Sequence, residues 1–345
     1  MFKHFCLVLG LLILLAGCDQ PQPPVQQESY VFGTRVEILV AGVPEARARE
    51  AAGAVLREFD RLHRTYHAWQ PSELTRVNEA LAAGRQIQVG PEMLAFIREA
   101  RELAHLGAYR FDPGIGALIR LWGFHSDEFK PVLPDPAALA AWRRAPASIA
   151  QLQIEGDRIG STNPRVALDF GGYLKGAALD LAAARLKQAG VHNALINIGG
   201  NIMALGNKNG KPWRVGIQHP RQPGALATLE LRDGEAIGTS GDYQRYFEVE
   251  GRRYSHLLDP ATGEPVTHTQ AVTVLMPPGP RAGTLSDALS KPIFIAGPEH
   301  WQAAARATGA GQVLRIAQDG RIQVTRALRA RLVFMGKPPA LEEVP

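Results

Sequence analysis

The segment at residues 166–186, VALDFGGYLKGAALDLAAARL, constrains the fold of this chain most strongly. A short apolar strand leads through an acid and a Gly-Gly turn to a lysine and a helix, one face of which carries Ala178, Leu181, Ala182 and Leu186. Such a turn brings backbone N–H groups and a helix N-terminus together, which is typical of phosphate binding. The segment lacks the Lys-Ser/Thr ending of a P-loop and the G-x-G-x-x-G of a dinucleotide-binding turn. It therefore predicts a phosphate site of another kind.

The N-terminus has the pattern of an exported lipoprotein. Lys3 and His4 precede an apolar run at residues 7–16, which has the length of a signal-peptide core and is too short to span a bilayer. The sequence LAGC at residues 15–18 resembles the lipobox of bacterial lipoproteins, in which the peptide is cut before the cysteine and Cys18 is lipidated. The alternative is an ordinary secretory signal with a chance cysteine. We expect residues 1–17 to be a lipoprotein signal peptide.

A polar segment follows this signal. Residues 18–29 are rich in Pro and Gln and offer almost nothing to bury, so we expect a lipidated, extended tether and then one domain at residues 30–340. The cysteines are Cys6, within the signal, and Cys18, so disulfides and thiolate chemistry are not expected in the mature chain. The net charge of +5 is spread along the chain without a basic block, which does not favour nucleic acid as a partner.

The periodicity of the body predicts an α+β fold. Alternating apolar residues predict a strand at residues 30–40, and a 3.6-residue period predicts helices at residues 44–63 and from Pro91 to a stop at Gly107. Residues 112–163 are expected to be loop-rich with short helices. Beyond the helix at the Gly-Gly turn, short apolar runs are separated by hairpin-length turns, which favours largely antiparallel sheets with packed helices.

Several motifs follow one another along the chain. They are VFGTRV (31–36), HAWQPSELTRVN (67–78), FDPGIGALIRLWGF (111–124), LDFGGYLKGAALD (168–180), LINIGGNI (195–202), WRVGIQHP (213–220), IGTSGDYQRYF (237–247), YSHLLDPATGEPV (254–266), AVTVL (271–275) and LSDALSKPIFI (285–295). Taken in this order, they resemble the ApbE family, the FAD:protein FMN transferases once described as thiamine-biosynthesis lipoproteins. The resemblance implies an ApbE-like, T-fold-related architecture. It also implies FAD as substrate, Mg²⁺, and transfer of FMN to a threonine hydroxyl of an acceptor protein with release of AMP.

The resemblance assigns the Gly-Gly turn to the pyrophosphate of FAD. Glycines let the backbone come close to a ligand, and donors at a helix start neutralise its charge. The residues implied to contact FAD are Phe32, Ala68, Trp69, Gln70, Arg110, Phe111, Asp112, Gly171, Ala177, His256 and Leu257.

The family's metal ligands match a main-chain carbonyl, an aspartate and a threonine, which correspond here to Leu174, Asp287 and Lys291. An ammonium group only donates hydrogen bonds, so Lys291 departs from the pattern. Either Ser290 or water supplies the missing oxygen, or Lys291 replaces part of the metal's charge. We expect a retained but altered Mg²⁺ site, since the other ligands are oxygens.

Catalytic roles are expected for His256 and Asp287. His256 would accept the threonine proton or hydrogen-bond the nucleotide, and the alternative is a buried structural histidine. Asp287 could instead be a helix N-cap residue, but as a cleft acid its replacement by alanine is expected to abolish transfer with little loss of fold. Lys175 would contact phosphate or pair with Asp169. The other histidines, among them His63, His105 and His125, show no ligand spacing.

Two other functions fit the same residues. Water in place of threonine would make the protein an FAD pyrophosphatase that yields FMN and AMP, and loss of chemistry would leave a flavin-binding lipoprotein. For the transferase, the expected acceptor is a membrane redox subunit. Asp19, directly after the cysteine, resembles the signal that retains lipoproteins on the periplasmic side of the inner membrane.

Overall fold

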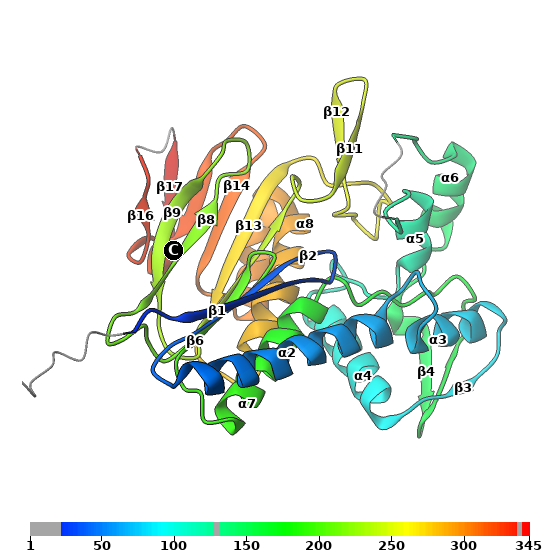
Figure 1. The fold of residues 1–345 in the computed structure, drawn as a ribbon. Coiled ribbons are helices and arrows are strands. Elements are labelled where there is room, and N and C mark those ends of the chain that lie inside the picture. Colours follow the sequence, from blue (N-terminus) through cyan, green and yellow to red (C-terminus); the bar gives the residue numbers. More distant parts are fainter. Residues whose placement is uncertain (1–21, 127–130, 337–339) are drawn as a thin grey trace, which may run out of the picture.

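The computed structural model describes residues 22–126, 131–336 and 340–345, and its centre is a nine-stranded sheet (Figure 1). Its strands, in spatial order, are β1 (Val25–Val31), β2 (Thr34–Val40), β6 (Ala194–Ile198), β7 (Asn201–Leu205), β10 (Ala236–Gly241), β13 (Thr269–Met276), β14 (Val313–Ala317), β15 (Ile322–Thr325) and β17 (Leu341–Val344). Neighbours pair antiparallel, apart from β15 and β17, which pair parallel.

Strand β13 shows why the sheet is covered on both faces. All eight of its residues are buried. Because successive side chains of a strand point to opposite faces, Val272 and Val274 enter one core while Ala271 and Leu275 enter another. The second core is closed by a three-stranded sheet of β16 (Val333–Phe334), β9 (Ala225–Leu231) and β8 (Trp213–Gln218).

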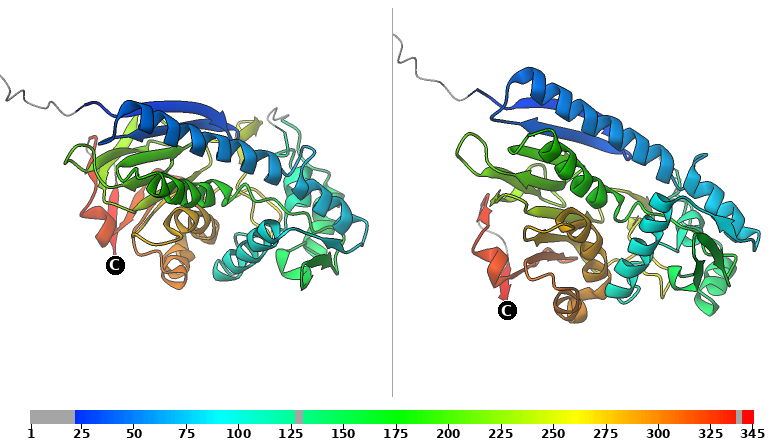
Figure 2. Two further views of the ribbon diagram at one scale, coloured as in Figure 1. Left: turned by 60° about the horizontal axis from the view of Figure 1, so that its bottom comes forward. Right: turned by 90° about the horizontal axis from the view of Figure 1, so that it is seen from below.

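Helices cover the other face. Figure 2 shows α2 (Glu45–Tyr66), α7 (Leu174–Gln188) and α8 (Ala282–Thr308) side by side beneath the sheet. The amphipathic helix α2 buries small and apolar residues along one stripe, including Val55 and Phe59. Helix α8 is kinked at Gly297, which has a φ of +75° and is followed by Pro298, where the i−4 hydrogen bond is lost.

A second group of elements lies at one end of this sheet. It comprises the helices α3 (Glu73–Ala82), α4 (Pro91–Leu106), α5 (Gly116–Leu121) and α6 (Pro136–Arg144), with a small sheet of β3 (Ile87–Gln88), β5 (Arg158–Ser161) and β4 (Leu152–Glu155). The hairpin of β11 (Tyr246–Val249) and β12 (Arg252–Ser255) projects beside it (Figure 1). Trp122 and Phe124 stack on Phe247 of this hairpin, with ring centroids 6.5 and 5.5 Å away.

The expected α+β class and antiparallel sheets are confirmed. The predicted helices correspond to α2, which begins at Glu45 and continues to Tyr66, and to α4, which ends at Gly107 as expected. The single strand predicted at residues 30–40 is wrong, because the chain reverses at Phe32 and Gly33 and forms β1 and β2. The loop-rich region at residues 112–163 holds short helices, as expected, in α5 and α6, but also the β4–β5 hairpin.

The predicted domain, residues 30–340, is too short at both ends. Residues 25–29, expected to be tether, lie in β1 and pair with β2, and residues 341–344 form β17 beside β15. Both strands lie at sheet edges and bury only one residue each, so they lack the alternating apolar pattern that marks a strand. The expected signal peptide and Cys18 lie outside the described residues. Within the described part of the chain, no helix is both long and apolar enough to cross a membrane.

Candidate active site

The start of α7 touches α8 through glycine. A Cβ atom at Gly176 would lie 2.4 Å from the carbonyl oxygen of Gly283, and a Cβ atom at Gly283 would lie 2.5 Å from that of Gly176. Gly238 of β10 is equally close to α8, because its Cβ atom would lie 2.5 Å from the Ser286 carbonyl oxygen. Side chains at these positions would separate the backbones, so glycine is required for the approach. The approach brings Asp287 of α8 to the first turn of α7.

Each of these helices caps the other. The Oδ2 atom of Asp287 accepts a hydrogen bond from the Gly176 N–H at 2.9 Å. Asp180 of α7 accepts the N–H groups of Gly283 and Thr284, each at 2.8 Å. The first N–H groups of a helix have no partner within it, and a carboxylate also favours the positive end of the helix dipole. Asp287 is therefore not the N-cap of its own helix, which begins at Ala282, but a cap of α7.

Asp287 is also ion-paired. Its Oδ1 atom accepts from the Lys291 ammonium, which in addition donates to the Asp287 carbonyl oxygen at 2.8 Å. The Asp287 side chain is 1% exposed and that of Lys291 13% exposed. Burial lowers the pKa of Lys291, the carboxylate of Asp287 acts against that shift, and the charge of Lys175 adds to it. Lys175, in the first turn of α7, and Lys291, through its pairing with Asp287, therefore both belong to this helix end.

The residues expected to hold Mg²⁺ do not fit a divalent cation. Both carboxylate oxygens of Asp287 are engaged, one by the Gly176 N–H and one by the Lys291 ammonium. Ser290, considered as a replacement ligand, donates to the Asp287 carbonyl oxygen at 2.7 Å and bonds the Ser240 hydroxyl at 2.7 Å. Among the described residues, no group of three or more His, Cys, Asp or Glu could hold a metal ion. Lys291 as a ligand is therefore a wrong prediction, because its ammonium binds the carboxylate that a cation would need.

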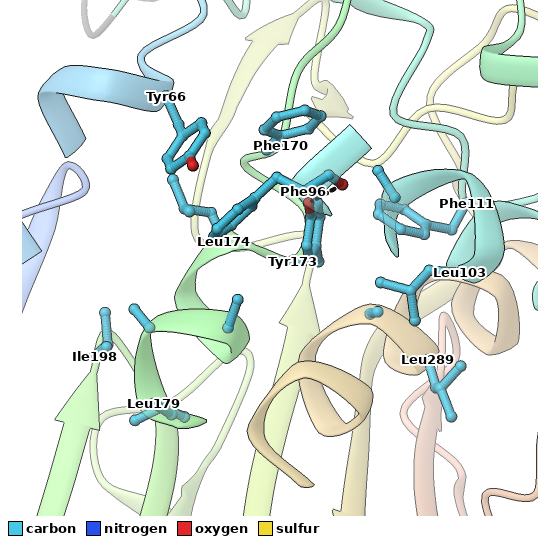
Figure 3. Packing of buried hydrophobic residues seen from close by; sticks show 14 of the residues in the cluster. Tyr66, Phe96, Leu103, Phe111, Phe170, Tyr173, Leu174, Leu179, Ile198 and Leu289 are labelled. Atoms are coloured by element: carbon cyan, nitrogen blue, oxygen red, sulfur yellow. Dashed lines mark hydrogen bonds between the residues drawn. The ribbon is translucent and has the colours of Figure 1, made fainter. Parts of the chain in front are cut away.

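The Gly-Gly turn lies at the front of α7. The Gly171 N–H donates to Asp169 Oδ1 at 2.7 Å, and Gly171 itself is exposed. Phe111 packs against Gly172 so closely that a Cβ atom there would lie 2.6 Å from the Phe111 Cε2 atom. Behind the turn, Phe170 and Tyr173 pack among Tyr66 and Phe96 (Figure 3). An aromatic cluster therefore fixes the turn while leaving its front open.

Asp169 connects this turn with a second segment. Burial raises the pKa of Asp169, whereas the Gly171 N–H, the charges of Arg245 and His67, and a hydrogen bond from the Trp69 side chain lower it. The ring of His67 holds the same segment, because its Nδ1 atom accepts the N–H groups of Trp69 and Gln70, each at 3.1 Å. Asp169 therefore accepts hydrogen bonds from Gly171 and Trp69 and does not form the ion pair with Lys175 that was one of the two alternatives.

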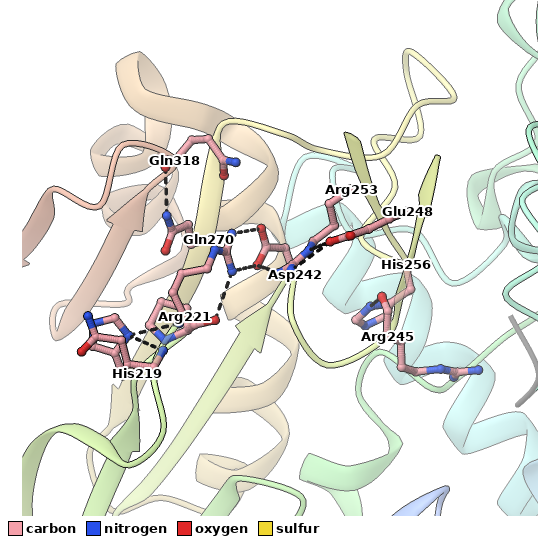
Figure 4. Close-up of polar contacts among 11 residues, drawn as sticks. His219, Arg221, Asp242, Arg245, Glu248, Arg253, His256, Gln270 and Gln318 are labelled. Carbon is pink, nitrogen blue, oxygen red and sulfur yellow. Dashed lines mark hydrogen bonds and ion pairs between the residues drawn. The ribbon is translucent and has the colours of Figure 1, made fainter. Parts of the chain in front are cut away.

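His256 is fixed from the other side. Its Nδ1 atom lies 3.1 Å from the carbonyl oxygen of Arg245, next to the hairpin that Figure 4 shows. A carbonyl oxygen only accepts, so Nδ1 carries the hydrogen and Nε2 keeps a lone pair. Burial lowers the pKa of His256 to about 3, and the charges of Arg245, Lys175 and Lys291 act in the same direction. His256 is thus a neutral imidazole in positively charged surroundings.

The low pKa of His256 predicts how stability depends on pH. The unfolded chain takes up a proton at this residue below about pH 6.5, whereas the folded chain does so only near pH 3, so stability is lost as pH falls between these values. We expect His256→Gln to flatten this loss by up to about 1 kcal/mol per pH unit. Thermal melts of both proteins at pH 7.5, 5.5 and 4.5 measure it. Parallel curves would mean that the imidazole titrates normally.

Comparisons with known proteins show the family of the chain. The sequence model of the ApbE family matches residues 32–314. The chain belongs to the ApbE family. It is 41% identical over 330 residues to the FAD:protein FMN transferase of Rhodobacter capsulatus, covering 94% of this chain and 62% of that protein. The corresponding protein of Vibrio cholerae is 32% identical, with 88% of this chain and 91% of the relative covered.

Solved ApbE structures have the same fold. The ApbE protein of Thermotoga maritima superimposes with a TM-score of 0.81 at 27% identity, covering 89% of this chain and 99% of that one. The flavin transferase ApbE of Vibrio cholerae gives 0.76 at 29% identity, with 90% and 100% covered. The chain spans less than two thirds of the Rhodobacter relative but nearly all of the Vibrio relative.

Several expected ApbE site residues gather at this place. Leu174 and Ala177 lie in the first turn of α7 beside Asp287 and Lys291, Phe111 lies on the turn, and Leu257 follows His256. Phe32 approaches this segment through a series of ring contacts. Its ring centroid lies 5.8 Å from that of His63, which lies 5.0 Å from that of His67. His63, expected to have no ligand role, thus contacts a candidate residue.

Others do not face the turn directly. The Oδ1 atom of Asp112 is buried and accepts the N–H groups of Gly114 and Ile149 at 2.7 and 2.9 Å, so this side chain holds its own loop.

Ala68, Trp69 and Gln70 line a cleft of about 1040 Å³ beside α3 and α5. The residues at the α7–α8 contact are not among those that line this cleft. The Arg120 guanidinium lies 5.5 Å from the centre of the Trp69 ring. The pKa of the neighbouring His125 is lowered, mainly because that residue is partly buried and also because of the charge of Arg120. Arg110 follows α4, and its main-chain N–H donates to the Gly107 carbonyl oxygen at 3.1 Å.

Sequence reasoning missed the supporting residues. Asp180, His67, Gly283 and Gly238 lie within or near the quoted motifs, yet none was given a role. An acid within the otherwise apolar run of α7 was an available signal for Asp180, because an unpaired buried carboxylate is costly. The glycine contacts join residues far apart in sequence, so no local pattern reports them.

Proposed function

We propose that this ApbE-family chain transfers the FMN part of FAD to a threonine hydroxyl of an acceptor protein. The threonine oxygen attacks the phosphorus of the FMN half and forms a phosphoester bond. The bond from that phosphorus to the bridging oxygen breaks, AMP leaves with this oxygen, and the threonine proton is released. Flavin transfer agrees with the names of the Rhodobacter and Vibrio relatives. The threonine and the details of the step belong to the proposal.

The observation that carries the proposal is the open Gly-Gly turn at the start of α7, with Lys175 and Lys291 beside it. A pyrophosphate is densely charged, and the charge on its bridging oxygen grows as AMP departs. Helix N–H groups and fixed ammonium groups stabilise that charge without reorganising during the reaction. Trp69, which is half-buried and whose side chain hydrogen-bonds Asp169, offers an apolar ring beside the turn for a flavin.

His256 is the residue we propose to receive the threonine proton. Its Nε2 atom has a free lone pair as long as Nδ1–H bonds the Arg245 carbonyl oxygen. Bound pyrophosphate brings negative charge to surroundings that are otherwise positive, which raises the pKa of the imidazole towards a useful range. Arg245 thus orients the base through its main chain.

Mg²⁺, which the resemblance implies, is not part of this proposal. The ion pair of Asp287 with Lys291 occupies the carboxylate that would bind it. The site residues themselves are expected to bind the pyrophosphate, orient FAD and move the proton.

The transferase is separated from the two alternatives by its products. Full-length protein is incubated with FAD and a candidate acceptor domain, and the mixture is run on a denaturing gel. A fluorescent acceptor band supports transfer. Free FMN and AMP without a band would identify an FAD pyrophosphatase, and unchanged, tightly bound FAD would identify a binding protein without chemistry.

We also propose that the protein is lipid-anchored on the periplasmic side of the inner membrane and acts on a membrane redox subunit. This rests on the lipobox at Cys18, on Asp19 and on the tether. We expect Cys18→Ser to move the protein from the membrane pellet to the supernatant, because the lipid would be its anchor. Fractionation of cells in high salt measures this. Continued sedimentation of the variant would contradict the lipobox.

A further inference from the structure

Lys291 is held in a fixed position in this site. Its ammonium bonds both the side chain and the main-chain carbonyl oxygen of Asp287, four residues earlier on α8. Asp287 in turn holds the Gly176 N–H at the start of α7. The lysine is therefore fixed in position relative to the helix end and the Gly-Gly turn.

We propose that the Lys291 ammonium is a built-in cation that takes the place of a resident divalent metal ion, so that FAD binding at this site needs no Mg²⁺. The inference rests on the proposed function in that it takes FAD as the ligand. Its two supports are the contacts of Asp287 and the accessibility of Lys291.

The contacts of Asp287 disfavour a metal ion. A divalent cation would need a carboxylate oxygen, but Oδ1 is bonded to Lys291 and Oδ2 to Gly176. Binding there would place a double positive charge directly beside the Lys291 ammonium. Mg²⁺ also needs several oxygen ligands in near-octahedral geometry, and the hydroxyl of Ser290 is engaged with Ser240.

The accessibility of Lys291 lets it act on a ligand. An ammonium has three N–H donors, and the two bonds to Asp287 leave one of them. The Lys291 side chain is 13% exposed, whereas that of Asp287 is 1% exposed, so of the two side chains the lysine is the more accessible to a ligand. A phosphate oxygen is the group that such a fixed, charged donor binds well.

The first test is made on the protein as it exists. FAD binding is titrated by fluorescence after dialysis against EDTA and again with added Mg²⁺. We expect the dissociation constants to agree within about threefold, since the charge on a phosphate is met by protein groups. A loss of about tenfold or more in EDTA would overturn the proposal.

The second test introduces an oxygen in place of the ammonium. Lys291→Thr frees Asp287 Oδ1 and adds a hydroxyl, so FAD affinity without metal should fall by about tenfold or more and Mg²⁺ should restore it. Mg²⁺ alone should also raise the melting temperature of this variant by about 2 °C or more, but not that of the original protein. An unchanged, metal-indifferent FAD affinity of Lys291→Thr would overturn the proposal.

Two further variants guard the interpretation. Lys291→Arg keeps the charge and is expected to bind FAD without metal, which also covers the case that Lys291→Thr fails to fold. Lys187→Met removes an exposed lysine from the last turn of α7 and should behave as the original protein. Because these readouts are binding and melting, they keep their meaning even if no flavin transfer is found.

Discussion

Asp287→Ala should abolish flavin transfer and lower the free energy of unfolding by about 3–5 kcal/mol. The substitution removes the carboxylate that pairs with the largely buried Lys291 ammonium. It also removes the acceptor of the Gly176 N–H hydrogen bond. The sequence alone predicts little loss of fold, because it treats Asp287 as an acid in an open cleft. The premise of that prediction is wrong, since the residue is 1% exposed and joins two helices. Urea unfolding and the transfer assay measure the two effects separately.

A second variant separates stability from function at this position. The pair Asp287→Ala with Lys291→Met removes both charges together, and replacing a buried ion pair by apolar groups is often neutral. We expect the double variant to regain most of the lost stability but no activity. Glu299→Ala, an exposed acid on the same helix, is the control and should change neither. A single Asp287 variant with full stability and activity would remove the residue from the site.

Gly176→Ala should destabilise the protein by about 1–3 kcal/mol, although alanine is the better helix former. The new Cβ atom would lie 2.4 Å from the Gly283 carbonyl oxygen and 2.7 Å from the Asp287 Cβ atom, and backbone cannot move aside as a flexible side chain can. The helices must separate, which also moves Asp287 and Lys291. FAD affinity is therefore expected to fall together with the melting temperature.

Gly53→Ala is the matched control for this change. Gly53 lies in α2, and its Cβ atom would meet the Arg57 Nη1 atom at 3.5 Å, an ordinary contact. Here the substitution should stabilise the protein by about 0.5–1 kcal/mol. The two glycines thus predict effects of opposite sign. If both substitutions stabilised the protein, the close contact of α7 with α8 would not exist.

The sequence predicts those parts of the fold whose pattern is local. The amphipathic stripe of α2 and the Pro91 and Gly107 boundaries of α4 follow from spacing and capping chemistry. The edge strands β1 and β17 escape prediction because each of them buries only one residue, so pairing with a neighbour, not burial, creates them. Sequence patterns report burial much better than they report pairing.

The candidate site divides in the same way. The Gly-Gly turn and Asp287 can be recognised from motifs, and the pairing of Asp287 with Lys291 follows from their spacing of four residues on one helix. The reciprocal contact of Asp180 with Thr284 cannot, because the partners are 104 residues apart. The metal expectation failed for a related reason, since a motif gives the residue types but not which oxygen is already bonded.

The central claim, transfer of FMN to a threonine, is tested most directly by mass spectrometry of the acceptor. Purified protein, FAD and the acceptor domain are incubated, the acceptor is digested, and released AMP is measured in the same sample. We predict one threonine peptide heavier by the FMN phosphoester, AMP equal in amount to bound flavin, and no modification when that threonine is changed to alanine. AMP and FMN formed together with an unmodified acceptor would contradict the claim.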